Sequence, residues 1–305
     1  MHSHLKQQTL WSLLLVLGSA LPASAQVVIE RSRPAPARGE ISIDSPFGTI
    51  AVRAWEKKEV KVTGTLAAGA EGLELDGDSE GVQIYVGVPD AWLHAPAEDA
   101  AFRSTLEVFA PVGARISIDT VNAEVAVHGF TDRVEAQSVN GKLTVTGPTA
   151  NVELESMTGG IETDARTSSM SLHTVSGSIA ARGAAGEIDI ETLSGEVEVK
   201  GLGVSRLDVD SVTGKVSFEG ALAPRGSVTI ETFSGPVRVA LPRSIRAAFE
   251  LKSFGGVIKS DFCQGTPITS ERLEPFRTLR CSTGLDSLEI QLQTHSGEIV
   301  VAAGD

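Results

Sequence analysis

The chain has 305 residues, a formal net charge of −13, 31 glycines and 5% aromatic residues. This acidic balance argues against nucleic acid and anionic membrane surfaces as partners, because binding to phosphate requires clustered Lys and Arg. Abundant glycine with few aromatic side chains favours a narrow β architecture over a bulky globular core.

The first 25 residues have the features of a signal peptide. A weakly basic start precedes an apolar run from Leu10 to Ala20, and Ala23-Ser24-Ala25 has the small-x-small pattern that signal peptidase requires. We therefore expect cleavage after Ala25 and export of the remaining chain to the periplasm or the cell surface. No later apolar segment has the roughly 20 residues that a membrane-spanning helix needs. We expect no transmembrane segment in the mature chain.

Residues 26–115 contain strand-like stretches without a constant spacing. One of them, Ile41 to Val52, matches the repeat unit found later in the chain, with Pro46 at an otherwise apolar place. The sequence therefore predicts an irregular, β-rich N-terminal part over 26–115, followed by a regular part over 116–305.

The regular part consists of one recurring unit. An alternating strand is followed by Ser or Thr, an apolar residue, Ser, Thr or Asn, then Gly, and a second alternating strand, as in Leu172-His173-Thr174-Val175-Ser176-Gly177. The intervals between copies are 18, 18, 18, 18, 19, 21, 21 and 41 residues, and the last interval holds two units or one unit with an insertion. The Ser or Thr of the unit stands at Thr120, Ser138, Ser156, Thr174, Thr192, Ser211, Thr232, Ser253 and Thr294.

Residue parity within the unit indicates how the chain bends. Met170, Leu172 and Thr174 share one face of the first strand, whereas the inward set after the Ser-Gly turn is Ile179 and Ala181. Parity flips where a chain turns around a core, and Gly supplies the special backbone angles of such a corner. A meander of two-residue hairpins is the competing interpretation, but it does not require one residue class at the same place in every copy. The sequence thus predicts an all-β fold, a parallel, β-helix-like solenoid of stacked 18–21-residue repeats.

The apolar residue of each corner is expected to stack on its equivalents in a continuous row. His295 takes this place in the last copy, and we interpret it as part of a terminal rung that meets water rather than as a catalytic residue. The other members of the row are Val121, Val139, Met157, Val175, Leu193, Val212, Phe233 and Phe254.

The two cysteines, Cys263 and Cys281, lie in the last part of the repeat array. In an oxidising compartment a disulfide is expected for such a pair, and closing this loop contributes about 3 kcal/mol in the loop-entropy model. A metal site and a reactive thiol are the alternatives, but the sequence has no CxxC motif and no nearby His.

The sequence contains none of the motifs that mark catalytic or cofactor sites, so we expect no catalytic residue and no cofactor. The one constellation of charged residues is acidic, because the outward positions of the first strands carry eight carboxylates between Glu135 and Glu231. They are Glu135, Glu153, Glu155, Asp189, Glu191, Asp208, Asp210 and Glu231.

Three interpretations of this acidic face remain open. Like charges can keep the face solvated and discourage association between sheets. Carboxylate pairs can bind divalent cations, the candidates being Asp189 and Glu191 together with Asp208 and Asp210. The face can also recognise a basic partner or a glycan, and a glycan-cleaving β-helix enzyme would place paired carboxylates in the same way.

The corner pattern, of the form Thr-Val-Ser-Gly or Thr-Leu-Ser-Gly, resembles the bacterial family described as putative adhesins, a domain of unknown function. Gly48-Thr49-Ile50-Ala51-Val52 and Pro111-Val112-Gly113 are further points of resemblance, which covers roughly Glu40 to Val301. It implies an exported β-repeat protein and provides no catalytic residues.

We therefore expect a non-catalytic, adhesin-like binding or structural module of the bacterial cell envelope, with an envelope protein or a glycan as partner. The alternatives are a periplasmic, stress-related scaffold without an external ligand, and a glycan-active β-helix enzyme.

Overall fold

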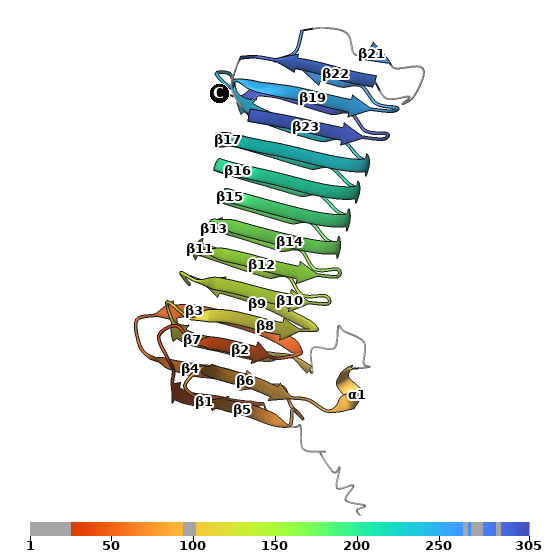
Figure 1. Cartoon of the computed structure of the whole chain (residues 1–305). Coiled ribbons are helices and arrows are strands. Elements are labelled where there is room, and N and C mark those ends of the chain that lie inside the picture. Colours follow the sequence, from red (N-terminus) through yellow and green to blue (C-terminus); the bar gives the residue numbers. More distant parts are fainter. Residues whose placement is uncertain (1–25, 94–101, 265–267, 270–276, 285–287, 305) are drawn as a thin grey trace, which may run out of the picture.

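The computed structural model describes residues 26–93, 102–264, 268–269, 277–284 and 288–304. In these ranges the chain forms a long stack of strands that run nearly perpendicular to the long axis of the molecule (Figure 1). Their one α-helix is α1 (Asp90–Leu93). No helix in the described ranges is long and apolar enough to cross a bilayer. The expected signal peptide and its cleavage site after Ala25 lie outside these residues.

Each regular rung of the stack has a first strand, a corner that contains the repeated glycine, a second strand, and a second corner. We call the four residues between the repeated Ser or Thr and the second strand the Gly corner. The three longest strands each run through a second corner without a break and so belong to two rungs. First strands are β8 (Arg115–Thr120), β10 (Arg133–Ser138), β12 (Asn151–Ser156) and β14 (Ser169–Ser176); second strands are β9 (Asn122–His128), β11 (Leu143–Pro148) and β13 (Ile161–Arg166); the continuous strands are β15 (Ile179–Ser194), β16 (Val197–Thr213) and β17 (Val216–Ser234).

Neighbouring rungs pair in parallel with equivalent positions aligned. Ser156 lies opposite Thr174, which lies opposite Thr192. Leu172 before the Gly corner and Ile179 after it are both buried, as the change of parity predicts. The predicted all-β solenoid is confirmed, because a meander of hairpins would pair these strands antiparallel.

In the rungs of β14 to β17, insertions enter the stack at the second corner. The Gly corner keeps its four residues at 175–178, 193–196 and 212–215, while the paired positions Arg182, Lys200 and Glu219 mark where successive second corners lengthen. The Gly corners of these rungs therefore form a straight edge. At the N-terminal end the segment between Gly87 and Ser104, which includes α1, enters on the Gly-corner side. The second corners form an uneven edge, from which Leu202 projects with 77% of its surface exposed.

The repeated glycine is required mainly by a close approach between rungs. A Cβ atom on Gly159 would lie 1.9 Å from the carbonyl oxygen of Gly141, and one on Gly177 would lie 2.2 Å from that of Gly159. Gly214 also has a left-handed φ of 135°, but Gly141, Gly159 and Gly177 do not. Special backbone angles therefore explain only part of the pattern.

At the C-terminal end the order of rungs in space differs from their order in the sequence. β23 pairs in parallel with both β17 and β19, so it lies between them (Figure 1), and β24 lies between β18 and β20 in the same way. The rung formed by β23 and β24 is the last in the sequence, but in space it is the second from the C-terminal end of the stack, inside the rung formed by β19 and β20. These elements are β18 (Val237–Pro242), β19 (Ala247–Ser253), β20 (Ile258–Ser260), β21 (Ile268–Thr269), β22 (Arg277–Ser282), β23 (Leu288–Thr294) and β24 (Ile299–Gly304).

The expected position of His295 in a terminal rung is therefore wrong. Its ring stacks between those of Phe233 and Phe254, with centroid distances of 4.8 and 4.6 Å and interplanar angles of 3° and 5°. Because β23 is inserted between two rungs, its corner residue has an aromatic neighbour on either side.

The N-terminal end uses the same arrangement. β2 pairs in parallel with both β6 and β8, and β3 with both β7 and β9, so the rung that is first in sequence lies inside the stack. Ile41 of β2 and Ile116 of β8 belong to one continuous core. A division at residue 115 stays a prediction. The elements are β1 (Val27–Pro34), β2 (Glu40–Asp44), β3 (Phe47–Trp55), β4 (Glu59–Leu66), β5 (Gly72–Gly77), β6 (Gly81–Gly87) and β7 (Ser104–Pro111).

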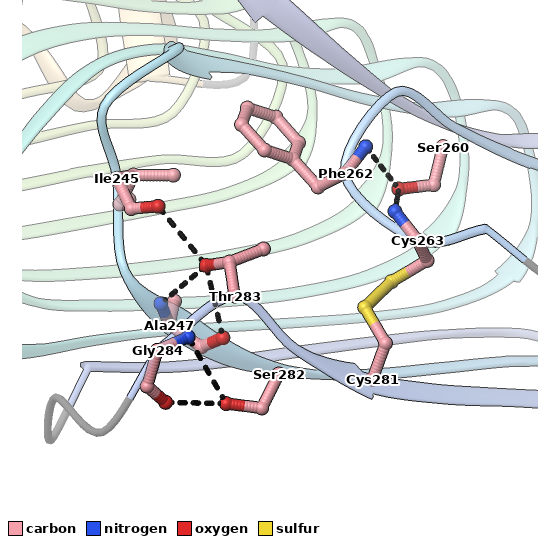
Figure 2. Close-up of a disulfide and its surroundings, with 9 residues drawn as sticks. All are labelled: Ile245, Ala247, Ser260, Phe262, Cys263, Cys281, Ser282, Thr283 and Gly284. Carbon is pink, nitrogen blue, oxygen red and sulfur yellow. Dashed lines mark hydrogen bonds between the residues drawn. A yellow bond between two sulfur atoms is a disulfide. The ribbon is translucent and has the colours of Figure 1, made fainter.

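Antiparallel strands cap both ends of the stack. β5 covers β6 and β4 covers β7 at one end, while β22 covers β19 at the other. At the N-terminal end β1 and β5 become the outermost strands, and among the described strands they pair only with β4 and β6. Cys281 of β22 forms the predicted disulfide with Cys263, which follows β20 (Figure 2). The bond joins the segment after β20, the outermost of the second strands, to the capping strand β22, beside Phe262, whose ring stacks on Phe249 at 5.4 Å.

Candidate functional site

The apolar residues of the Gly corners form an exposed row along the straight edge of the solenoid. Their backbones are linked from rung to rung, as where Thr158 N donates to Val139 O and Ser176 N to Met157 O. Exposure ranges from 36% at Val139 to 60% at Phe233. We call this row, together with His295, the corner ladder: Val139, Met157, Val175, Leu193, Val212, Phe233, His295 and Phe254.

A row of carboxylates runs parallel to the corner ladder, on the outward positions that end the first strands. The sheet register places Glu191 opposite Asp210, and Asp210 opposite Glu231. The same row extends to the N-terminal end, where Asp44 lies opposite Asp119. We call these six residues the acidic row: Asp44, Asp119, Glu155, Glu191, Asp210 and Glu231.

A groove lies between the acidic row and the corner ladder. Its larger section has a volume of about 730 Å³ and runs from Glu155 and Met157 to His295. A second section of about 300 Å³ continues from Glu155 and Met157 to Asp44. The floor consists of the repeated Ser and Thr residues, whose side chains are short. The groove is therefore a direct result of the repeat: each copy has a polar residue, which is a carboxylate in six copies, then a small residue and then the corner residue.

Two kinds of hydrogen bonding occur along this floor. At Ser138 and Ser156 the hydroxyl accepts a hydrogen bond from the amide of Gly141 and Gly159, at 2.8 and 2.9 Å. In the central rungs the glycine amide donates instead to the backbone of the next rung, as Gly177 does to Ser194 O. Within the described part of the chain the buried hydroxyls of these rungs have no hydrogen-bond partner: Thr174, Thr192, Ser211 and Thr232.

The carboxylates of the acidic face repel one another and are partly desolvated. Burial raises the pKa of Asp210, and the charges of Glu231 and Asp208 raise it further. Burial likewise raises the pKa of Asp189, a shift that the neighbouring His173 opposes. His173 lies between Glu155 and Glu191 in the sheet register, and its Nδ1 is 3.3 Å from Glu191 Oε2.

The outward side of the second strands differs, because its charges form ion pairs. Glu162 lies 2.6 Å from Lys142 and 2.8 Å from Arg182, and these two cations hold its pKa below the usual value. Lys215 and Glu196 pair at 2.7 Å. On the outward face of the second strands, ion pairs therefore neutralise most charges. Along the acidic row, most of the negative charge is not neutralised.

The sequence-derived metal candidates are brought together as the repeat predicts. Asp189 lies opposite Asp208, and Glu191 opposite Asp210, on adjacent strands. Arg206 already pairs with Asp208 at 2.5 Å. Among the described residues no group of three or more His, Cys, Asp or Glu side chains is arranged to hold a metal ion. Cation binding by these four residues stays a prediction.

Sequence reasoning missed the extent of the groove. Asp44 precedes Ser45 and Pro46 as Asp119 precedes Thr120 and Val121, so the match between Ile41–Val52 and the repeat unit could have placed it in the acidic row. Nothing in the sequence indicated that the corner ladder is exposed, because apolar residues at regular spacing usually face a core.

Asp210→Asn is expected to raise the free energy of unfolding at pH 7 by about 0.5 kcal/mol, a modest gain because solvent screens half-exposed carboxylates. Since the pKa of Asp210 is raised above its ordinary 3.8, the folded chain holds this proton more tightly than the unfolded chain. The penalty is complete above the folded-state pKa and disappears below the unfolded value. The stabilisation should therefore fade as the pH falls from 7 towards 4 in urea unfolding curves.

Glu162→Gln is the matched control on the ion-paired face. The pKa of Glu162 is lowered by Lys142 and Arg182, so this change should reduce stability at pH 7, and the loss should shrink as the pH falls below 4.5 and vanish below the folded-state pKa. If Asp210→Asn lowers stability as Glu162→Gln does, the acidic row is not under repulsion.

Comparison with known proteins identifies the fold family. A family model described as Toastrack DUF4097 matches residues 39–302. The comparison with curated proteins gives no significant match.

Three solved structures are similar over most of this chain. A putative adhesin from Bacteroides fragilis is 12% identical, with 91% of this chain and 98% of that chain covered and a TM-score of 0.45. A putative adhesin from Parabacteroides distasonis is 8% identical, with 91% and 98% covered and a TM-score of 0.38. A putative cell adhesion protein from Clostridium sporogenes is 10% identical, with 91% and 100% covered and a TM-score of 0.26. The names of these three proteins describe those proteins alone. At this level of identity they assign no function to the present chain.

Proposed function

We propose that this chain, which belongs to the Toastrack DUF4097 family, is an exported, non-catalytic, adhesin-like binding module of the bacterial cell envelope, and that it binds its partner along the groove. The observation that carries the proposal is the corner ladder, an apolar row that stays exposed rung after rung beside the carboxylates of the acidic row. Exposed apolar residues that gather in one place, bordered by polar side chains, mark interaction sites on soluble proteins.

The constancy of the Gly corner supports this proposal. Insertions in the longer rungs enter at the second corner and leave the groove straight. The groove lies on the long side of the molecule, between the antiparallel strands that cap its two ends.

The export part of the proposal rests on the first 25 residues and on the disulfide. An apolar run that is followed by a small-x-small site such as Ala23-Ser24-Ala25 is typical of secreted proteins. Disulfides such as Cys263–Cys281 persist mainly in oxidising compartments outside the cytoplasm.

The experiment that tests the proposal is co-sedimentation of the labelled protein with envelopes isolated from its host. We expect the wild-type protein to sediment and the variant Leu193→Ser/Phe233→Ser to lose at least 90% of this binding, because the two side chains supply much of the exposed apolar surface. Leu202→Ser is the matched control: it removes an apolar side chain that is 77% exposed on the opposite edge, and its binding should equal that of the wild type.

The same cells can be fractionated with protease added before and after the outer barrier is opened. Digestion on intact cells, or only after opening, would agree with export to the surface or to the periplasm. Recovery of the protein in the cytoplasm would contradict export. Equal sedimentation of the wild type and the groove variant, or none, would contradict binding through the groove and leave a scaffold without external ligand.

A further inference from the structure

We propose that the occupant of the groove is a cationic amphipathic α-helix of another molecule, lying lengthwise along the corner ladder. The inference rests on the proposed function and specifies its ligand. It follows from three properties of the groove: the sign of its charge, the state of its backbone hydrogen bonds and its axial spacing.

The charge of the groove selects a cationic partner. Asp210 and Glu231 form no ion pair with another described residue, and both border the larger section of the groove. The row is already under mutual repulsion, since neighbouring carboxylates raise the pKa of Asp210. Lys or Arg side chains along one border of the occupant would relieve this repulsion while its apolar face covers Met157, Val175 and Leu193.

The backbone of the Gly corner excludes an added β-strand. Its amides are already used between rungs, as where Met157 N donates to Ser138 O and Ser176 N to Met157 O. An extended peptide gains its affinity from the free N–H and C=O groups of a sheet edge, and the groove runs across the rungs, not along such an edge. A partner with its own hydrogen bonds satisfied fits this surface better, and a helix satisfies them internally.

The axial spacing of the groove also favours a helix. Rungs repeat at about 4.8 Å, a helical turn advances about 5.4 Å, and side chains on one face of a strand advance about 6.7 Å. Over the five intervals from Met157 to His295 the mismatch is about 3 Å for a helix and more than 9 Å for a strand. A helix of about 16 residues therefore keeps its apolar stripe on the ladder over the whole larger section of the groove.

The aromatic residues at one end of the corner ladder would anchor one end of such a helix. Phe233, His295 and Phe254 form a three-ring stack in which Phe233 is 60% exposed. Broad rigid rings of this kind are common anchors at protein interfaces because they bury much area at little entropic cost.

The test uses a fluorescent 18-residue helical peptide made of Leu and Lys, with one apolar stripe and Lys on its border, titrated with the purified protein in an anisotropy assay. We expect saturable binding that weakens as salt rises. Leu193→Ser/Phe233→Ser should weaken it at least tenfold, because the helix would bury both apolar side chains. Asp210→Asn/Glu231→Gln should weaken it severalfold and flatten the salt dependence, and Leu202→Ser should leave it unchanged.

Two control peptides distinguish the contribution of helical structure from the contributions of charge and amino-acid composition. A peptide with the same residues in alternating, strand-forming order, and a helix with Glu in place of Lys, should both bind at least tenfold more weakly. Equal binding of either peptide, equal binding by all protein variants, or no binding of the Leu-Lys helix would overturn the inference. So would a dimer of the protein alone that Leu193→Ser/Phe233→Ser dissolves, because the groove would then be occupied by a second copy. If the helix fails while envelope binding still depends on the groove, only the ligand assignment falls.

Discussion

Gly159→Ala should lower the free energy of unfolding by about 3 kcal/mol or more, which is at the upper end of the cost of overpacking. The added methyl group would lie 1.9 Å from the carbonyl oxygen of Gly141 and 2.6 Å from its carbonyl carbon. Both atoms belong to backbone that is fixed by pairing between rungs, so relief requires two rungs to separate. Urea unfolding followed by circular dichroism measures the loss.

Gly203→Ala is the matched control for this prediction. Gly203 has a φ of 78° and no atom within 4 Å of its would-be Cβ, so the change costs only the left-handed backbone strain, about 1–2 kcal/mol. If Gly159→Ala is no more destabilising than Gly203→Ala, the close approach between rungs is not what requires glycine at the corner.

Replacing both cysteines, Cys263→Ser with Cys281→Ser, should lower the free energy of unfolding by about 3 kcal/mol, the cost of releasing a loop of this length. The cysteines stand 18 positions apart, and their bond ties the segment after β20 to β22, which covers β19 (Figure 2). Solenoid stability depends on contacts between neighbouring rungs, so the loss should concentrate at this cap. Hydrogen exchange of the β19 and β22 amides, together with thermal unfolding, tests this expectation.

Reduction of the wild-type disulfide provides a control for the double Ser variant. A reducing agent should lower the unfolding temperature of the wild type to that of the double Ser variant and have no effect on the variant itself. Faster exchange should appear in β19 and β22 and spare β12, which lies many rungs away. Equal stability of the two proteins under oxidising conditions would contradict a stabilising role for the bond.

The groove changes how the acidic residues are understood. From the sequence they were a solvated face, a site for divalent cations or a recognition surface. The structure places Glu155, Glu191, Asp210 and Glu231 along one wall of a groove whose other wall is apolar. A face that serves only solubility has no need of an exposed apolar ladder beside it, which is why we favour recognition.

The sequence alone determined the rung. The period of two within a strand and the change of parity at the corner assign Leu172 and Ile179 to the core, and the constant interval between Ser/Thr positions sets the register of Ser156, Thr174 and Thr192. These features are local, and each copy repeats them, so they can be read without knowing how the rungs stack. The pairing of Cys263 with Cys281 was equally accessible, since the chain has no other cysteine.

Only the tertiary structure decided the order of rungs at the two ends and the exposure of the corner ladder. Hydrogen bonds between rungs join backbone groups that every rung has, so nothing in the residues of β23 states that it pairs with β17 on one side and β19 on the other. The exposure of Leu193 and Phe233 depends on where the chain turns, and spacing along the sequence does not distinguish an apolar residue inside a bend from one outside it. The groove exists because equivalent corners from many rungs align, and that alignment is a property of the assembled stack.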